Sequence, residues 1–88
     1  MSKNVWITGA SSGIGKATAI KFANEGWQVA VSARRKELLD ELSKENSNIS
    51  SFPLDVTNRK SCIQVFEDIL KKYSNIDLCI LSTGTYDP

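Results

Sequence analysis

The stretch TGASSGIG at residues 8–15 decides the fold of this chain. It follows a short apolar run, Val5-Trp6-Ile7, which is long enough for a buried strand. After it, apolar residues recur at roughly helical spacing, at Ile14, Ala17, Ile20, Phe22 and Ala23. The glycines therefore stand at a turn from a strand to a helix, and in that context a glycine pattern predicts dinucleotide binding.

Each glycine of this turn has a separate expected role. Gly9 lets the chain leave the strand in a tight turn, Gly13 leaves room for a pyrophosphate, and Gly15 lets the first helical turn pack on the strand. The free N–H groups and positive end of the helix then face the phosphates. The expected phosphate-binding residues are Gly9, Ser11, Ser12, Gly13, Ile14 and Gly15. The alternative is a glycine-rich turn that binds no ligand.

Length and composition favour one small domain, residues 1–88, of marginal stability. The net charge of +1 comes from mixed charges without a basic block, which indicates neither nucleic acid nor an anionic membrane as a partner. Histidine is absent, and Cys62 and Cys79 form no metal-type motif, so we expect no metal and two buried thiols in a reducing compartment. No signal-peptide pattern and no apolar span of about 18 residues occurs, so a soluble cytoplasmic protein is expected.

Strand and helix patterns alternate along the chain, which predicts an α/β fold. The expected strands cover residues 5–8, 27–32, 49–54 and 76–81, and the first two helices cover residues 13–24 and 34–44. A third helix should begin after a cap at Thr57 or Asn58. Its expected core face is Val65, Phe66, Ile69, Leu70 and Tyr73.

Strands joined by helices imply a parallel sheet with right-handed crossovers. The expected strand order is 3-2-1-4, the first half of a Rossmann-type sheet with flanking helices, and we expect a truncated form of a longer fold. The fourth strand would be an open apolar edge at residues 78–81. Such an edge is expected to be covered by a longer chain or to support self-association.

The sequence Ala33-Arg34-Arg35 stands where a dinucleotide fold usually reads the adenosine ribose. An acidic residue there would accept a hydrogen bond from the ribose 2′-hydroxyl. An arginine pairs instead with a 2′-phosphate, so Arg34 predicts NADP(H) rather than NAD(H). The alternative is that Arg34 and Arg35 are merely exposed residues at a helix start.

The chain resembles the short-chain dehydrogenase/reductase family along its whole length, beginning with the cofactor motif at residues 8–15. The resemblance agrees with NADP preference through Ala33 and Arg34, although Ser12 stands where some such members carry a basic residue. It implies that Asp55 accepts from the adenine amino group, with the Val56 backbone beside it. The alternative role for Asp55 is to end a strand and cap the next helix.

The resemblance is weaker after the fourth strand. The family has Asn-Asn-Ala-Gly there, whereas this chain has Leu81-Ser82-Thr83-Gly84. The backbone of Ser82, Thr83 and Gly84 is still expected to line the adenosine ribose. The missing asparagines remove whatever side-chain support they give the sheet.

The family resemblance implies hydride transfer between NADP(H) and an alcohol or carbonyl carbon. The family's catalytic serine and Tyr-x-x-x-Lys pair are absent, because Asp77 occupies the lysine spacing after Tyr73 and Tyr86 has no residue at that spacing. We therefore expect no catalytic residue in this chain and no activity from it alone. The alternatives are a stand-alone dinucleotide-binding module or redox sensor, and a related chemistry such as epimerisation or dehydration. The substrate is not indicated.

Overall fold

The computed structural model describes residues 3–9, 13–54 and 58–81. Strands and helices alternate strictly along the chain. Their bounds are β1 (Asn4–Thr8), α1 (Gly13–Asn24), β2 (Gln28–Ser32), α2 (Lys36–Glu45), β3 (Ile49–Ser51), α3 (Arg59–Tyr73) and β4 (Leu78–Leu81). The predicted alternation is confirmed, and the boundaries differ from the expected ones by a few residues.

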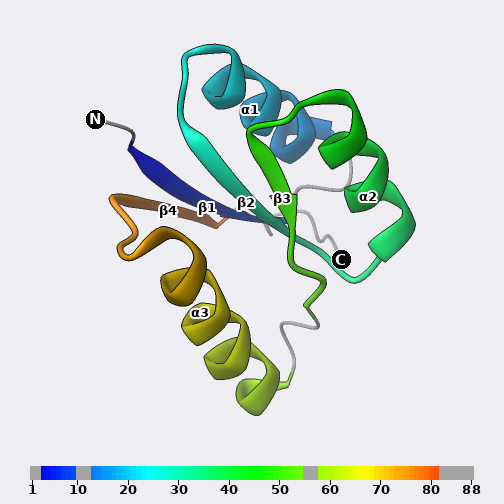
Figure 1. The fold of residues 1–88 in the computed structure, drawn as a ribbon. Coiled ribbons are helices and arrows are strands. Elements are labelled where there is room, and N and C mark those ends of the chain that lie inside the picture. Colours follow the sequence, from blue (N-terminus) through cyan, green and yellow to red (C-terminus); the bar gives the residue numbers. More distant parts are fainter. Residues whose placement is uncertain (1–2, 10–12, 55–57, 82–88) are drawn as a thin grey trace.

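The strands form one parallel sheet in the order β3-β2-β1-β4 (Figure 1). The central pair runs in register from Asn4 opposite Gln28 to Thr8 opposite Ser32. Each connection between successive strands contains one helix, as parallel strands require. After β3 the chain crosses to the far side of β1, which confirms the predicted Rossmann-type fold with strand order 3-2-1-4.

Helices cover both faces of the sheet, with α1 and α2 on one face and α3 on the other (Figure 1). Successive strand residues point to opposite faces, so each central strand contributes to two cores. The core under α1 and α2 consists of Val5, Ile7, Ala19, Ala23, Val29, Val31, Ala33, Leu39, Leu42 and Ile49. The core under α3 consists of Trp6, Ala30, Leu54, Val65 and Ile69.

The packing face of α1 differs from the expected one. Ile14 is 81% exposed and Ala17 is also exposed. The residues buried against the sheet are Gly15, Ala19 and Ala23, which recur every fourth residue. Small side chains let the helix approach the sheet closely. The expected positions Ile20, Phe22 and Ala23 are confirmed as core contacts, whereas Ile14 and Ala17 are not. The sequence pattern misled because glycine and alanine mark a buried face only weakly.

The packing face of α3 is covered only in part. Val65 and Ile69 are buried as expected, but Phe66 is 44% exposed. The Phe66 ring lies 6.1 Å from the Trp6 ring between centroids, so only its inner edge packs against the core. Asn58 is the cap of this helix, and its Oδ1 accepts a hydrogen bond from the Ser61 N–H at 3.1 Å.

β4 is an edge strand, as predicted, and its apolar residues are not fully covered by the described residues. Leu78 is 39% exposed and Cys79 is exposed, while Cys62 on α3 is partly buried. The expectation of two buried thiols is therefore wrong, because β4 has a neighbour on one side only. Among the described helices, none is both long and apolar enough to cross a lipid bilayer.

Candidate functional site

The predicted site residues that the structure describes lie at the carboxyl edge of the sheet. Gly9 follows β1 directly, residues 13–15 open α1, and Arg34 lies between β2 and α2. The Gly9 N–H donates to the Ser32 carbonyl at 2.7 Å, so the glycine turn is bonded to the end of β2. The other predicted site residues lie outside the described residues: Ser11, Ser12, Asp55, Val56, Ser82, Thr83 and Gly84.

The glycine turn has a backbone that residues with side chains rarely adopt. The φ angles of Gly9 and Gly13 are 73° and 62°, both in the left-handed region. A Cβ placed on Gly13 would meet no described atom within 4 Å, so the space beside this turn is open. Gly15 is buried against the sheet, in keeping with close helix packing. Positive φ angles and missing side chains at Gly9 and Gly13 are features that a phosphate-binding turn uses.

The start of α1 is suited to an anion. Its first turn contains no acidic residue, so no carboxylate offsets the positive end of the helix dipole. The unpaired N–H groups of a first helical turn are a common phosphate-binding device. Ile14 in the same turn projects into solvent, where it offers an apolar surface to a bound molecule.

A second turn at the same edge carries the arginines. Arg34 and Arg35 are exposed, and the helix that the sequence placed from Arg34 begins at Lys36. Arg35 is the cap residue, in an extended conformation, and its side chain makes no capping hydrogen bond. The start of α2 thus differs from the start of α3, where Asn58 satisfies a backbone N–H.

The residues around the start of α2 line a shallow hollow of about 560 Å³. The lining residues are Arg34, Arg35, Lys36, Glu37 and Leu38, three cations against one anion. Lys36 is already paired with Asp40 at 2.8 Å. This hydrogen bond raises the pKa of Lys36 and lowers the pKa of Asp40, so both remain charged at neutral pH.

One buried polar contact and one buried hydroxyl near this edge were not predicted from the sequence. The Trp6 indole N–H donates to the Ser32 hydroxyl at 2.8 Å, and both residues are buried. The Thr8 hydroxyl is buried and has no hydrogen-bond partner among the described residues. A tryptophan and a serine inside strands that are otherwise apolar were the available signals, but neither identifies its partner.

Tyr73 lies at the opposite end of the sheet, half-buried, with its hydroxyl donating to the Val29 carbonyl at 3.3 Å. Burial raises the pKa of this phenol, in agreement with the expectation that Tyr73 is a core residue. Within residues 3–9, 13–54 and 58–81, no cluster of three metal-ligating side chains occurs.

Comparisons with known proteins agree with this geometry. A family model described as short chain dehydrogenase matches residues 3–88. The 3-oxoacyl-[acyl-carrier-protein] reductase of Thermotoga maritima is 42% identical over 82 residues, which cover 89% of this chain and 33% of that protein. A solved short chain dehydrogenase from Bacillus anthracis has a TM-score of 0.82 at 38% identity, over 88% of this chain and 34% of its own.

A second solved structure adds a ligand. The 3-ketoacyl-(acyl-carrier-protein) reductase of Brucella melitensis, in complex with NADH, has a TM-score of 0.84 at 27% identity, over 88% of this chain and 32% of its own. The chain therefore spans about a third of the length of the relatives it matches. Because the family model covers nearly every residue, this chain belongs to the short chain dehydrogenase family and carries its Rossmann-type dinucleotide-binding fold.

Proposed function

We propose that this chain is the NADP(H)-binding portion of an oxidoreductase that acts on an alcohol or carbonyl group. The observation that carries the proposal is the pairing of two turns at one sheet edge. One is a glycine turn beside open space, and the other is an arginine turn at an uncapped helix start. The direct bond from Gly9 to Ser32 holds the two turns next to each other.

The two turns suit different phosphates of one dinucleotide. Residues 9–15 would receive the pyrophosphate at the start of α1, and Arg34 would pair with the 2′-phosphate of the adenosine ribose. Family resemblance assigns the adenine to Asp55 and Val56, and the ribose to Ser82, Thr83 and Gly84. The bound nicotinamide would supply hydride chemistry, while the protein supplies binding and orientation.

The preference for NADP(H) follows from charge. Ala33 places no carboxylate against a 2′-phosphate, and Arg34 offers several donors to it. A hydrogen bond to a charged group is worth about 1.5–3 kcal/mol. That corresponds to a preference of about 10- to 100-fold for NADPH over NADH. The lower part of this range is expected, because Ser12 adds no charge.

Calorimetric titration of the 88-residue chain with NADPH and NADH tests this proposal. The expected result is tighter binding of NADPH, and Arg34→Ser should bring the two dissociation constants together. Arg59→Ser is the matched control, since Arg59 is another exposed arginine beside a helix start but belongs to α3. Equal wild-type affinities, or an equal effect of the two substitutions, would contradict the NADP assignment.

We propose further that this chain alone binds the dinucleotide without turning it over. It contains no Tyr-x-x-x-Lys pair, and its curated relatives are about three times longer. A panel of aldehydes and ketones should therefore cause no NADPH consumption, because no general acid stands near the nicotinamide. Steady consumption that scales with protein concentration would show an unrecognised catalytic group. We also propose a cytoplasmic location, because the charges are mixed and neither Cys62 nor Cys79 forms a disulfide.

The β4 edge is proposed as a self-association surface. β4 exposes Leu78 and Cys79, and among the described strands it pairs with β1 alone. Unpaired strand edges with apolar side chains favour pairing with another strand. Sedimentation should show association at high concentration, and Leu78→Lys should reduce it. A monomer at every concentration would contradict this proposal.

A further inference from the structure

We propose that Trp6 is a positioning residue for the dinucleotide site, acting through Ser32. This inference rests on the proposed cofactor binding. It adds a supporting hydrogen bond between residues that belong to neither the glycine pattern nor the arginine pattern. Its basis is the buried hydrogen bond from the Trp6 Nε1–H to the Ser32 Oγ at 2.8 Å. The bond joins the middle of β1 to the last residue of β2.

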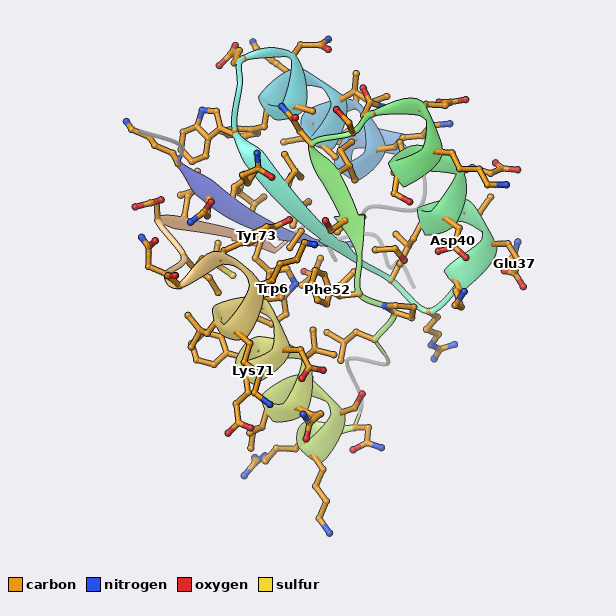
Figure 2. All side chains as sticks on the ribbon, viewed as in Figure 1. Trp6, Glu37, Asp40, Phe52, Lys71 and Tyr73 are labelled. Carbon is orange, nitrogen blue, oxygen red and sulfur yellow. The ribbon has the colours of Figure 1, made fainter. Side chains whose placement is uncertain are left out.

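The register of the sheet explains how the indole reaches this hydroxyl. Trp6 lies opposite Ala30, and Ser32 lies two residues further toward the carboxyl edge on the same face. Ala30 is small and fully buried, so it leaves room for the indole beside it. Figure 2 shows Trp6 between the sheet and α3. The packing of α3 residues against the indole restricts its orientation.

Ser32 connects the indole to both ligand-facing turns. Its carbonyl accepts the Gly9 N–H at 2.7 Å, which anchors the glycine turn at its first residue. Its next neighbours in sequence are Ala33 and Arg34, which form the arginine turn. A rotation at Ser32 would therefore displace the phosphate-binding backbone and the arginine together. The indole bond holds the Ser32 side chain, while the Gly9 bond holds its main chain.

Packing alone does not account for this pair. A smaller apolar residue at either position would satisfy a core without burying a hydroxyl. Ser32 is 0% exposed, so its hydroxyl cannot be solvated if the indole N–H is removed. The polar pair includes Ser32, whose carbonyl accepts a hydrogen bond from Gly9 of the glycine turn. That location indicates control of site geometry in addition to stability.

Two substitutions remove the bond from opposite ends. Trp6→Phe keeps an aromatic ring but deletes the donor, and Ser32→Ala deletes the acceptor. Each should weaken NADPH binding about tenfold, and the double variant should be no weaker than the singles, because both remove one shared bond. NADPH affinity should fall more than NADH affinity, since displacement of Arg34 affects only the 2′-phosphate. Trp27→Phe is the matched control, because that indole packs on Phe22 away from the site.

A merely structural role predicts a different result. Stability would fall in the variants, but the affinities of the folded fraction and their NADPH-to-NADH ratio would stay at wild-type values. Unchanged affinities in Ser32→Ala and Trp6→Phe, measured where denaturant titration shows both to be folded, would overturn the inference. Additive losses in the double variant would do the same.

A measurement made without cofactor tests this inference independently of the proposed function. Amide hydrogen exchange at Gly9 should accelerate in Trp6→Phe, while exchange at Ile7 in the middle of β1 should not. Wild-type chain that binds no dinucleotide would refute the proposed function. Equal exchange rates at Gly9 in wild type and Trp6→Phe would refute the positioning role itself.

Discussion

The two ends of the sheet differ in how their polar groups are hydrogen-bonded. At the amino end, Asn4 is buried and its Nδ2 donates to the carbonyls of Tyr73 and Asn75 at 3.2 and 3.0 Å. The Asn4 N–H donates to the Asp77 carboxylate at 2.7 Å, and the Asp77 N–H donates back to the Asn4 carbonyl at 2.8 Å. Every one of these groups is bonded within the chain.

At the carboxyl end, not every polar group of the described residues is bonded in this way. The glycine turn has no described atom within 4 Å of a Gly13 Cβ, and the cap residue of α2 makes no side-chain capping bond. The Thr8 hydroxyl is buried without a partner among the described residues. Buried polar groups in a protein are normally satisfied, so we propose that this edge, where a bound ligand would satisfy them, is the binding end of the sheet.

The largest expected effect separates two glycines that share a conformation. Gly13 at the carboxyl end and Gly26 at the amino end both have positive φ, at 62° and 92°, and a Cβ on either would meet no described atom within 4 Å. Gly13→Val and Gly26→Val should each lower stability by about 1–2 kcal/mol through backbone strain. Only Gly13→Val should also weaken NADPH binding, by more than about 100-fold, since the side chain occupies the pyrophosphate position.

Calorimetry on the folded variants checks this pair. Gly13→Asn is an additional variant, because asparagine tolerates positive φ and so adds a side chain with little strain. It should fold and still bind NADPH poorly. Wild-type affinity in Gly13→Asn, or equal loss of affinity in both valine variants, would contradict the proposal that a phosphate binds beside Gly13.

The next effect concerns the hydrogen bonds of Asn4 at the amino end. Asn4→Ala leaves the Tyr73 and Asn75 carbonyls without their donor, so we expect a loss of about 2–3 kcal/mol in the free energy of unfolding. NADPH affinity of the folded protein should not change. Asn46→Ala is the control, because that side chain makes a single bond of 3.3 Å to Leu42, and its loss should be smaller. Urea denaturation measures the free energy of unfolding of both variants. Weakened cofactor binding in Asn4→Ala would contradict the proposal that the carboxyl end alone binds the cofactor.

A smaller effect tests the arginine turn. Ala33→Asp combined with Arg34→Ser replaces a donor for phosphate by an acceptor for a 2′-hydroxyl, so cofactor preference should change from NADPH to NADH. The expected wild-type preference is about tenfold, and it should weaken as salt screens the exposed Arg34. The measurement is the pair of dissociation constants at two salt concentrations. An unaltered preference in the double variant would show that the hollow at α2 does not read the 2′-phosphate.

The smallest effect lies again at the amino end. Ser74 ends α3 with φ at 74°, a conformation that favours glycine. Ser74→Gly should therefore raise stability by about 1 kcal/mol and leave cofactor affinity unchanged. Ser43→Gly, within α2, should instead lower stability by about 0.5 kcal/mol because glycine weakens a helix interior. Thermal unfolding distinguishes the two, and a loss of stability in Ser74→Gly would show that its side chain has a bonding role.

The order of elements, the parallel sheet and the strand order could be predicted from the sequence alone. These features follow from short-range signals: hydrophobic period, glycines that permit positive φ, and the handedness of crossovers. The glycine turn itself was predictable for the same reason, because Gly9 and Gly13 adopt their φ angles through local steric freedom.

Only the tertiary structure decided which residues complete the two ends of the sheet. Asn4 meets Asn75 across 71 positions, and Trp6 meets Ser32 across 26, so no local pattern contains either pair. Tertiary packing also decided that α1 buries its small residues and leaves Ile14 exposed, since the sheet selects the closest approach rather than the largest side chain. Short-range chemistry therefore specified the framework, while long-range packing specified which distant polar groups are hydrogen-bonded to one another.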